Sequence, residues 1–229
     1  MKKFFVVMVS FVFVLLAQAQ FAHATPTLVL YDTATGATGT GISNPNGTAF
    51  FDGNIGGNWT VVLTTGSTYT ALGSATDPNM DLSVTSAKYT GTAPTTLDIL
   101  FYDNGYTYSG GFTSTAKVTD FADMALGSYV DFSTGYTSTP GLPPTGVTVI
   151  DTTGNLYAPI IPDTTVSGIG TLVPTDYFGE LDQIYAAGPS YAASLDYHTE
   201  VPEPGTFLLL GLGLLAFAIV GSKLAKQNA

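Results

Sequence analysis

The chain contains no cysteine and no arginine, and it has few lysines, two histidines and a single tryptophan. Without cysteine it can form no disulfide bond, no thiol nucleophile and no zinc-thiolate site, and it cannot carry a lipoprotein-type lipidated cysteine. The stability of any folded domain must therefore come from the burial of side chains rather than from covalent cross-links.

Cations are scarce in the central part of the sequence, where Lys88 and Lys117 are the only ones between Thr25 and Glu200. Of the 17 acidic residues, only Glu203 lies outside this part. Such a negative balance repels phosphate backbones, which argues against a nucleic-acid partner. It suits solubility outside the cell, or cation binding.

The first 24 residues are typical of a secretory signal peptide. Two lysines precede an apolar run over residues 4–17, and Ala22 and Ala24 then present the small side chains that a signal peptidase accepts. We expect signal peptidase to cut after Ala24, with a cut after Ala19 as an alternative. An uncleaved N-terminal anchor would usually need a longer apolar core of about 20 residues.

Residues 25–200 are expected to form one exported β-domain. This part is rich in Thr, Ser, Gly and Tyr and poor in good helix formers, which favours strands and turns. Alternating apolar residues, separated by short turn signals, predict antiparallel strands in a β-sandwich or jelly roll. The alternating sets are Trp59, Val61 and Leu63; Leu82 and Val84; Leu97, Ile99 and Phe101; and Phe112, Ala116 and Val118.

Further strands are expected at 146–150, 166–173 and 191–197, the last with Tyr191 and Tyr197 on one face. Many prolines and glycines predict a long surface loop over 138–161. From His198 to Val201 we expect an extended or disordered tether, because the prolines that follow resist helix formation.

The C-terminal end predicts a single transmembrane helix. Residues 205–222 carry no charge, with Glu203 before them and Lys223 and Lys226 after them. A helix of this length, at about 1.5 Å per residue, just crosses a hydrocarbon core of about 30 Å. Lysines after the span stay cytoplasmic by the positive-inside rule, which places the β-domain outside the cytoplasm.

The residues Pro202, Glu203 and Pro204, followed by this apolar stretch and a basic end, closely resemble the PEP-CTERM sorting signal over residues 201–229. The resemblance implies that exosortase, a membrane enzyme, recognises Pro202, Glu203 and Pro204, while the helix and Lys223 and Lys226 retain the substrate in the membrane. The family usually ends in an arginine-rich cluster, whereas here only the two lysines are basic. An ordinary stop-transfer anchor is the alternative interpretation.

The resemblance also implies an inner-membrane anchor before processing, and then a place on the cell surface or in the extracellular matrix. Members of this family are commonly linked to exopolysaccharide and biofilm, so we expect a structural or adhesive role with exopolysaccharide as a possible partner. The alternatives are a carbohydrate-binding module and, less in keeping with the sequence, a secreted polysaccharide-active enzyme.

The sequence does not favour an enzyme. His198 is the only histidine after Ala24, and in a tether nothing would position it as a general base. A glycosidase-type carboxylate pair stays open, because the separation of two acids is unreadable from sequence. We expect Trp59 to lie in the core and Tyr102, Tyr106 and Tyr108 to be exposed and able to stack on sugar rings.

No cofactor and no metal site are predicted. The segment 77–81 begins like a calcium loop, but Leu82 replaces the required glycine and Lys88 replaces the bidentate glutamate. A simple turn is preferred there, and a calcium site of another type stays open.

Overall fold

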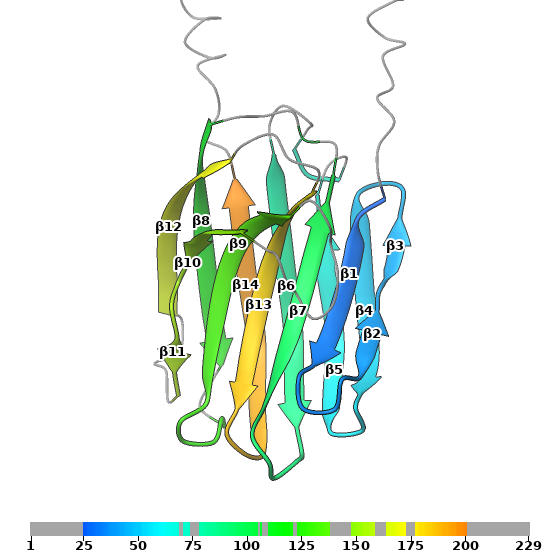
Figure 1. The fold of residues 1–229 in the computed structure, drawn as a ribbon, viewed down its shortest axis with the longest axis vertical. Helices are drawn as coiled ribbons and strands as arrows, with labels where there is room; N and C mark the ends of the chain where they lie inside the picture. Colours follow the sequence, from blue (N-terminus) through cyan, green and yellow to red (C-terminus); the bar gives the residue numbers. More distant parts are fainter. Residues whose placement is uncertain are drawn as a thin grey trace, which may run out of the picture.

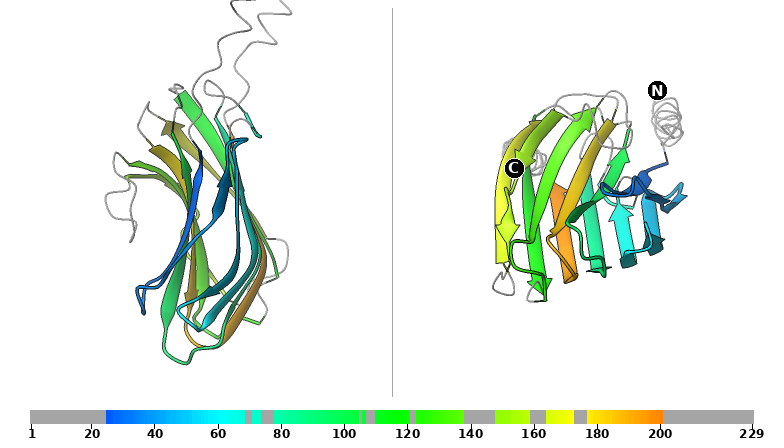
Figure 2. Two further views of the ribbon diagram at one scale, coloured as in Figure 1. Left: turned by 90° about the vertical axis from the view of Figure 1, so that its right-hand side faces the viewer. Right: turned by 60° about the horizontal axis from the view of Figure 1, so that its bottom comes forward.

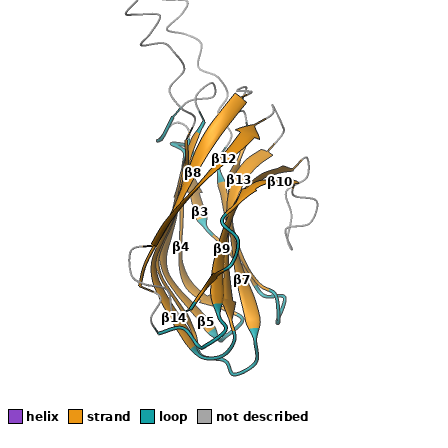
Figure 3. Ribbon diagram, turned by 90° about the vertical axis from the view of Figure 1, so that its left-hand side faces the viewer, coloured by secondary structure: helices purple, strands orange, loops and turns teal. Residues whose placement is uncertain are grey.

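The computed structural model describes residues 25–68, 71–73, 78–104, 106, 110–120, 123–137, 148–158, 164–172 and 177–200. These residues form strands and connecting turns, and no helix (Figure 3). The strands are β1 (Thr27–Asp32), β2 (Thr38–Thr40), β3 (Ile42–Asn44), β4 (Thr48–Ile55), β5 (Trp59–Ser67), β6 (Asn79–Tyr89), β7 (Thr95–Asp103), β8 (Gly110–Asp120), β9 (Tyr129–Thr137), β10 (Thr148–Thr152), β11 (Leu156–Tyr157), β12 (Thr164–Leu172), β13 (Tyr177–Ala186) and β14 (Ser190–Glu200).

Two antiparallel sheets face each other, as the front and back layers of Figure 1 show. Sheet A has the order β10-β9-β13-β7-β1-β2, with β11 also paired to β9. Sheet B has the order β12-β8-β14-β6-β5-β4-β3. The edge-on view in Figure 2 shows both layers curving in the same sense. The predicted antiparallel β-sandwich is confirmed, whereas the predicted signal peptide over 1–24 and the helix over 205–222 lie outside the described residues.

The core lies between the sheets and is built by alternation. On β7, Leu97, Ile99 and Phe101 are fully buried, as predicted from their period of two. On β8, the predicted set of Phe112, Ala116 and Val118 is buried as well. These strands therefore present an apolar face to the opposite sheet, and this burial holds the two layers together.

Alternation changes face halfway along β6 and β14. Ala192 and Leu195 of β14 are both buried, and the intervening Ser194 has a φ of 52°. Their partners on β6, Ala87 and Val84, are likewise both buried. The prediction that Tyr191 and Tyr197 share one face is therefore wrong, because this switch puts Tyr197 in the core and leaves Tyr191 partly exposed.

Several elements differ from the sequence-based expectation. The strands β1, β2, β3, β4, β9, β11 and β13 were not predicted. The strand expected at 146–150 corresponds to β10, whereas β11 lies within the range 138–161 that was predicted as a long loop; both strands pair with β9. The backbone groups of these two strands are thus satisfied by the edge of sheet A rather than by water.

Candidate functional site

The described structure ends where the sorting signal begins. β14 lies inside sheet B, between β6 and β8, and its last residue, Glu200, is in register with Asn79 and Thr113. The predicted recognition residues Pro202, Glu203 and Pro204, the retention residues Lys223 and Lys226, and the signal-cleavage residues Ala22 and Ala24 all lie outside the described residues. Within the described part of the chain there is no helix long and apolar enough to cross a membrane.

His198 belongs to β14, so the prediction of a tether from residue 198 is wrong. Its register partners are Asp81 on β6 and Thr115 on β8. The ladder of a central strand satisfies its backbone, which outweighs the influence of the prolines further along the chain. The sequence argument that nothing positions this histidine therefore fails.

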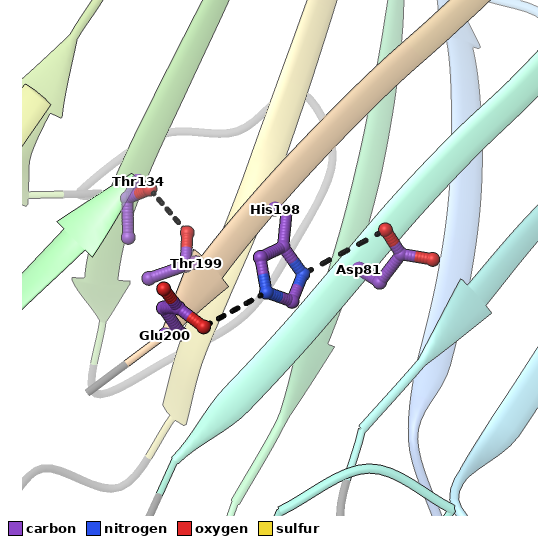
Figure 4. A network of polar contacts seen from close by, with 5 residues as sticks. All are labelled: Asp81, Thr134, His198, Thr199 and Glu200. Atoms are coloured by element: carbon purple, nitrogen blue, oxygen red, sulfur yellow. Dashed lines mark hydrogen bonds and ion pairs between the residues drawn. The ribbon is translucent and has the colours of Figure 1, made fainter. Parts of the chain in front are cut away.

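The His198 ring lies between two carboxylates on the outer face of sheet B (Figure 4). Its Nδ1 is 3.8 Å from Asp81 Oδ1, and its Nε2 is 3.6 Å from Glu200 Oε2. All three side chains are partly exposed, at 31%, 34% and 56% for His198, Asp81 and Glu200. Burial and the neighbouring Asp196 raise the pKa of Asp81 to about 6, although His198 lowers it. The contacts tie the last strand to β6 electrostatically, but solvent weakens them.

The outer face of sheet A carries a row of tyrosines at one end. Tyr129 of β9 stacks on Tyr185 of β13 with ring centroids 4.9 Å apart. Tyr157 of β11 meets Tyr129 edge-on at 5.5 Å and is 58% exposed. Antiparallel register brings the three side chains together from strands that are far apart in sequence.

A polar row follows these tyrosines on the same face. The Gln183 amide donates to Asp98 Oδ1 at 2.8 Å, and the next strand places Asp131 in register with Gln183. The Thr152 hydroxyl donates to Asp131 at 2.8 Å. Burial raises the pKa of Asp98, and the bond from Gln183 partly lowers it. Carboxylate and amide groups here lie beside an aromatic surface, as they do in many sites for polar ligands.

A second tyrosine pair, Tyr102 and Tyr177, occupies the other end of the face, with centroids 5.8 Å apart. Of the predicted exposed tyrosines, Tyr102 is partly exposed, Tyr106 is buried against Phe178, and Tyr108 lies outside the described residues. The expectation for Tyr106 is therefore wrong. Trp59 is 1% exposed and packs on Tyr89, which confirms its place in the core.

Sequence reasoning missed two acidic residues in the core. Glu180 and Asp182 of β13 are fully buried on the face that turns towards sheet B. The signal that could have revealed them is the alternation of Phe178, Glu180, Asp182 and Ile184, in which two acids occupy apolar positions. The residues of the suspected calcium loop that are described, 78–81, lead into β6 instead. In the described residues no three His, Cys, Asp or Glu side chains are grouped so as to hold a metal ion.

Several solved structures are similar to this chain at low sequence identity. The carbohydrate-binding module TmCBM61, solved with β-1,4-galactotriose, is 5% identical, and the match covers 62% of this chain and 86% of that one, with a TM-score of 0.36. The adhesin domain of Epf from Streptococcus pyogenes is 12% identical over 79% of this chain and 60% of that one, with a TM-score of 0.37. The N-terminal part of endo-1,4-β-D-xylanase 10B from Clostridium thermocellum is 14% identical over 50% and 24%, at 0.30. With TM-scores this low, these likenesses support no inference about ligand or activity.

The sequence matches a family model. No curated protein matches the chain. The model of the PEP-CTERM protein-sorting motif matches residues 200–223, which confirms the resemblance read from Pro202, Glu203 and Pro204. Such a motif implies export and processing by an exosortase. The chain is therefore a β-sandwich protein that carries a C-terminal PEP-CTERM protein-sorting motif.

Proposed function

We propose that this protein is an exported surface or matrix protein whose β-sandwich is delivered by processing at Pro202, Glu203 and Pro204. The observation that carries the proposal is the junction at Glu200. The family match starts at this residue, and β14 ends at it, still in register with both neighbouring strands. A membrane enzyme can thus reach the motif without unfolding the domain.

The ends of the chain have distinct roles in this scheme. Signal peptidase recognises Ala22 and Ala24 and removes residues 1–24. The helix over 205–222 then holds the chain in the inner membrane. Two prolines favour an extended backbone, which suits an active-site cleft. Lys223 and Lys226 keep the far end of the helix cytoplasmic until exosortase acts.

The role of the β-domain is structural or adhesive rather than catalytic in this proposal. Its support is the chemistry of the one described histidine, because both ring nitrogens of His198 are directed at carboxylates. A general base needs a free nitrogen within reach of the substrate proton. The setting that we propose is an exopolysaccharide matrix, in which an acidic domain remains soluble.

The sorting function is tested with the double variant Pro202→Ala, Pro204→Ala. A chain tagged in the β-domain is expressed in a host that carries an exosortase, and the products are compared by membrane fractionation and intact mass. We expect wild type to lose its C-terminal helix, and the variant to be exported and folded but to stay uncut in the membrane. As the control, the apolar segment 207–220 is replaced by another apolar helix of equal length, and cutting should persist. If wild type and variant both keep the full tail, the segment is a plain anchor and the proposal fails.

Carbohydrate binding is a second candidate function, favoured by the outer face of sheet A. Tyr185 and Tyr177 mark tyrosine clusters at the two ends of this face, about 26 Å apart at about 3.3 Å per residue along β13. Between them lies the polar pair of Asp98 and Gln183. Aromatic faces can stack on the apolar faces of sugars, and polar groups can bind their hydroxyls.

This second function is tested by titrating the protein with the exopolysaccharide of the producing cells and with a soluble β-linked glucan. Tyr129→Ala and Tyr185→Ala should each weaken binding at least about tenfold, the effect of losing about 1.4 kcal/mol of contact. Tyr191→Ala on sheet B is the matched control and should bind like wild type. Equal affinities in all three variants would rule this face out as the binding surface.

A further inference from the structure

Two acidic side chains are enclosed between the sheets with no compensating charge. Glu180 and Asp182 are both 0% exposed, and they project from the same face of β13 because they are two residues apart. In sheet A, Glu180 lies between Phe101 and Thr134, and Asp182 lies between two apolar neighbours on β7 and β9. Neither carboxylate can reach water.

None of the four carboxylate oxygens accepts a hydrogen bond of normal geometry in the described structure, although the Thr199 hydroxyl lies near enough to Glu180 to lower its pKa. Both oxygens of Glu180 and both oxygens of Asp182 are buried without a donor. A buried polar group left unpaired costs about 1–3 kcal/mol, and an unpaired charge costs more. Native proteins leave few such groups, so four oxygens at one place indicate a missing partner.

The charges around the pair do not compensate it. The ionisable groups that act on Asp182 are Asp196, Asp81 and Asp131, all of them acidic. Burial raises the pKa of Asp182, and these acids raise it further. The lysines within the described ranges, Lys88 and Lys117, have exposed side chains outside the core. The partner of this pair is therefore not a basic side chain.

Oxygen atoms of neutral side chains from both sheets lie close to Glu180: Thr134 is beside it on β9 of sheet A, and Tyr197 and Thr199 are on β14 of sheet B. The Tyr197 hydroxyl is 2.6 Å from Thr134 Oγ1, and Thr199 Oγ1 is 3.1 Å from the same atom. Figure 4 shows Thr199 reaching from β14 towards Thr134 on β9. Burial raises the pKa of Glu180; hydrogen bonding to the Thr199 hydroxyl partly lowers it, and Asp182 raises it again. Glu180 thus lies beside this set of hydroxyl oxygens, and Asp182 is the next residue on the same face of β13.

We propose that Glu180 and Asp182 bind a calcium ion inside the sandwich, with hydroxyls from Thr134, Tyr197 and Thr199 available to complete its oxygen shell. Calcium accepts six to eight oxygen ligands in irregular geometry, including bidentate carboxylates. Magnesium demands a near-ideal octahedron and usually keeps several waters, so a shell made of protein oxygens suits calcium better. Softer metals select imidazole and thiolate ligands; the chain has no cysteine, and His198 lies on the outer face of sheet B.

The proposed site contains only two carboxylates, fewer than the three or more acidic or histidine ligands that many metal sites have. The hydroxyls from β9 and β14 bring ligands from both sheets to one ion. Bound calcium would neutralise the pair and join the layers, so its free energy of binding adds to the free energy of folding. The proposal does not depend on how the chain is sorted.

The test uses the full chain, exported by a host that lacks an exosortase and purified in detergent, with calcium alone as the probe. Metal content is measured by mass spectrometry after desalting, and thermal unfolding is followed at pH 7 in excess calcium and in excess EGTA. We expect about one calcium ion per chain and a midpoint about 5 °C higher in calcium. Glu180→Gln and Asp182→Asn should abolish both, while Asp52→Asn, at an exposed position on β4, should change neither.

Two results would overturn the proposal. One is a wild-type protein that holds no calcium and unfolds at the same temperature in calcium and in EGTA, with Glu180→Gln at least as stable. The pair would then be two protonated acids. The other is calcium binding that survives in both amide variants, which would place the ion elsewhere. Because the amides keep the shape of the acids, these variants are expected to fold.

Discussion

Asp32, at the end of β1, is buried as deeply as Glu180 and Asp182 on β13, but its oxygens have different surroundings. Asp32 is 1% exposed and accepts hydrogen bonds from the Thr95 hydroxyl at 2.5 Å, the Thr35 hydroxyl at 2.7 Å and the Ala34 amide at 3.1 Å. The β13 pair accepts none. The comparison shows that this fold can satisfy a buried carboxylate where a turn supplies donors, whereas the inner face of β13 does not do so for Glu180 and Asp182.

The largest effect is expected at Asp32, where the comparison can be broken by removing the acceptor. Asp32→Ala leaves the donors of Thr35, Thr95 and Ala34 without their partner. We expect the free energy of unfolding in urea to fall by about 3 kcal/mol. Asp52→Ala, an exposed acid on β4, should change it by no more than about 0.5 kcal/mol. Equal losses in the two variants would mean that the bonds to Asp32 contribute nothing.

The next largest effect concerns Glu180, and it is measured in EGTA so that no calcium is bound. Burial raises the pKa of Glu180 above its ordinary value. Above the ordinary pKa the unfolded chain loses this proton while the folded chain keeps it, so wild-type stability falls as the pH rises through that window. Glu180→Gln removes this linkage and should gain on wild type by about 1–2 kcal/mol between pH 5 and pH 8. Urea unfolding at both pH values measures it, and identical pH profiles would contradict the raised pKa.

Asp98 lies between the two extremes, because it has one side-chain donor. Gln183→Met keeps the shape of residue 183 but removes its bond to Asp98. We expect a loss of about 1.5 kcal/mol and a further rise in the pKa of Asp98, because the bond now lowers it. Stability should therefore fall more steeply with rising pH than in wild type. Tyr185→Phe, on the same strand, serves as the control. If Gln183→Met lowers the free energy of unfolding no more than this control does, the bond to Asp98 does not stabilise the fold.

The smallest effect is expected on the surface. His198→Ala should change the free energy of unfolding by no more than about 0.5 kcal/mol, because its contacts with the two carboxylates are long and partly exposed to solvent. The variant should, however, raise the pKa of Asp81 above about 6, because His198 now lowers it. An NMR titration of the Asp81 carboxyl carbon measures this shift. A lower pKa in the variant would contradict the assigned contact.

Composition and alternation were enough to predict the β-sandwich, and the strands around Trp59, Ile99 and Phe112 were located correctly. β13 was missed because Glu180 and Asp182 interrupt its apolar face. Its apolar residues therefore do not alternate with a period of two, which is the signal that predicts a strand. The change of face at Ser194 could not be predicted either. It depends on the φ of 52° at Ser194 and on a matching change of face in the paired strand β6. Local pattern cannot reveal what neighbouring strands impose.

The candidate sites divide in the same way. The sorting motif was readable because its recognition residues are contiguous in the sequence, and the family match confirms it. The tyrosine row of Tyr129, Tyr157 and Tyr185 was not readable, because it exists only through the register of β9, β11 and β13. His198 was expected in a tether because Pro202 and Pro204 follow it. Its position is instead determined by the pairing of β14 with β6 and β8.

The central place of β14 affects the order in which this protein can mature. If the N-terminal end crosses the membrane first, as the proposed signal peptide implies, β14 is the last strand to arrive. Until then β6 and β8 each have an unpaired edge, open to pairing with another chain. Closing the sheet requires contacts between distant parts of the sequence, which form slowly. Completion of the fold and presentation of the sorting residues thus both depend on β14. In a molecule whose sheet B has not closed, β14 would be unpaired when the motif reaches the processing enzyme.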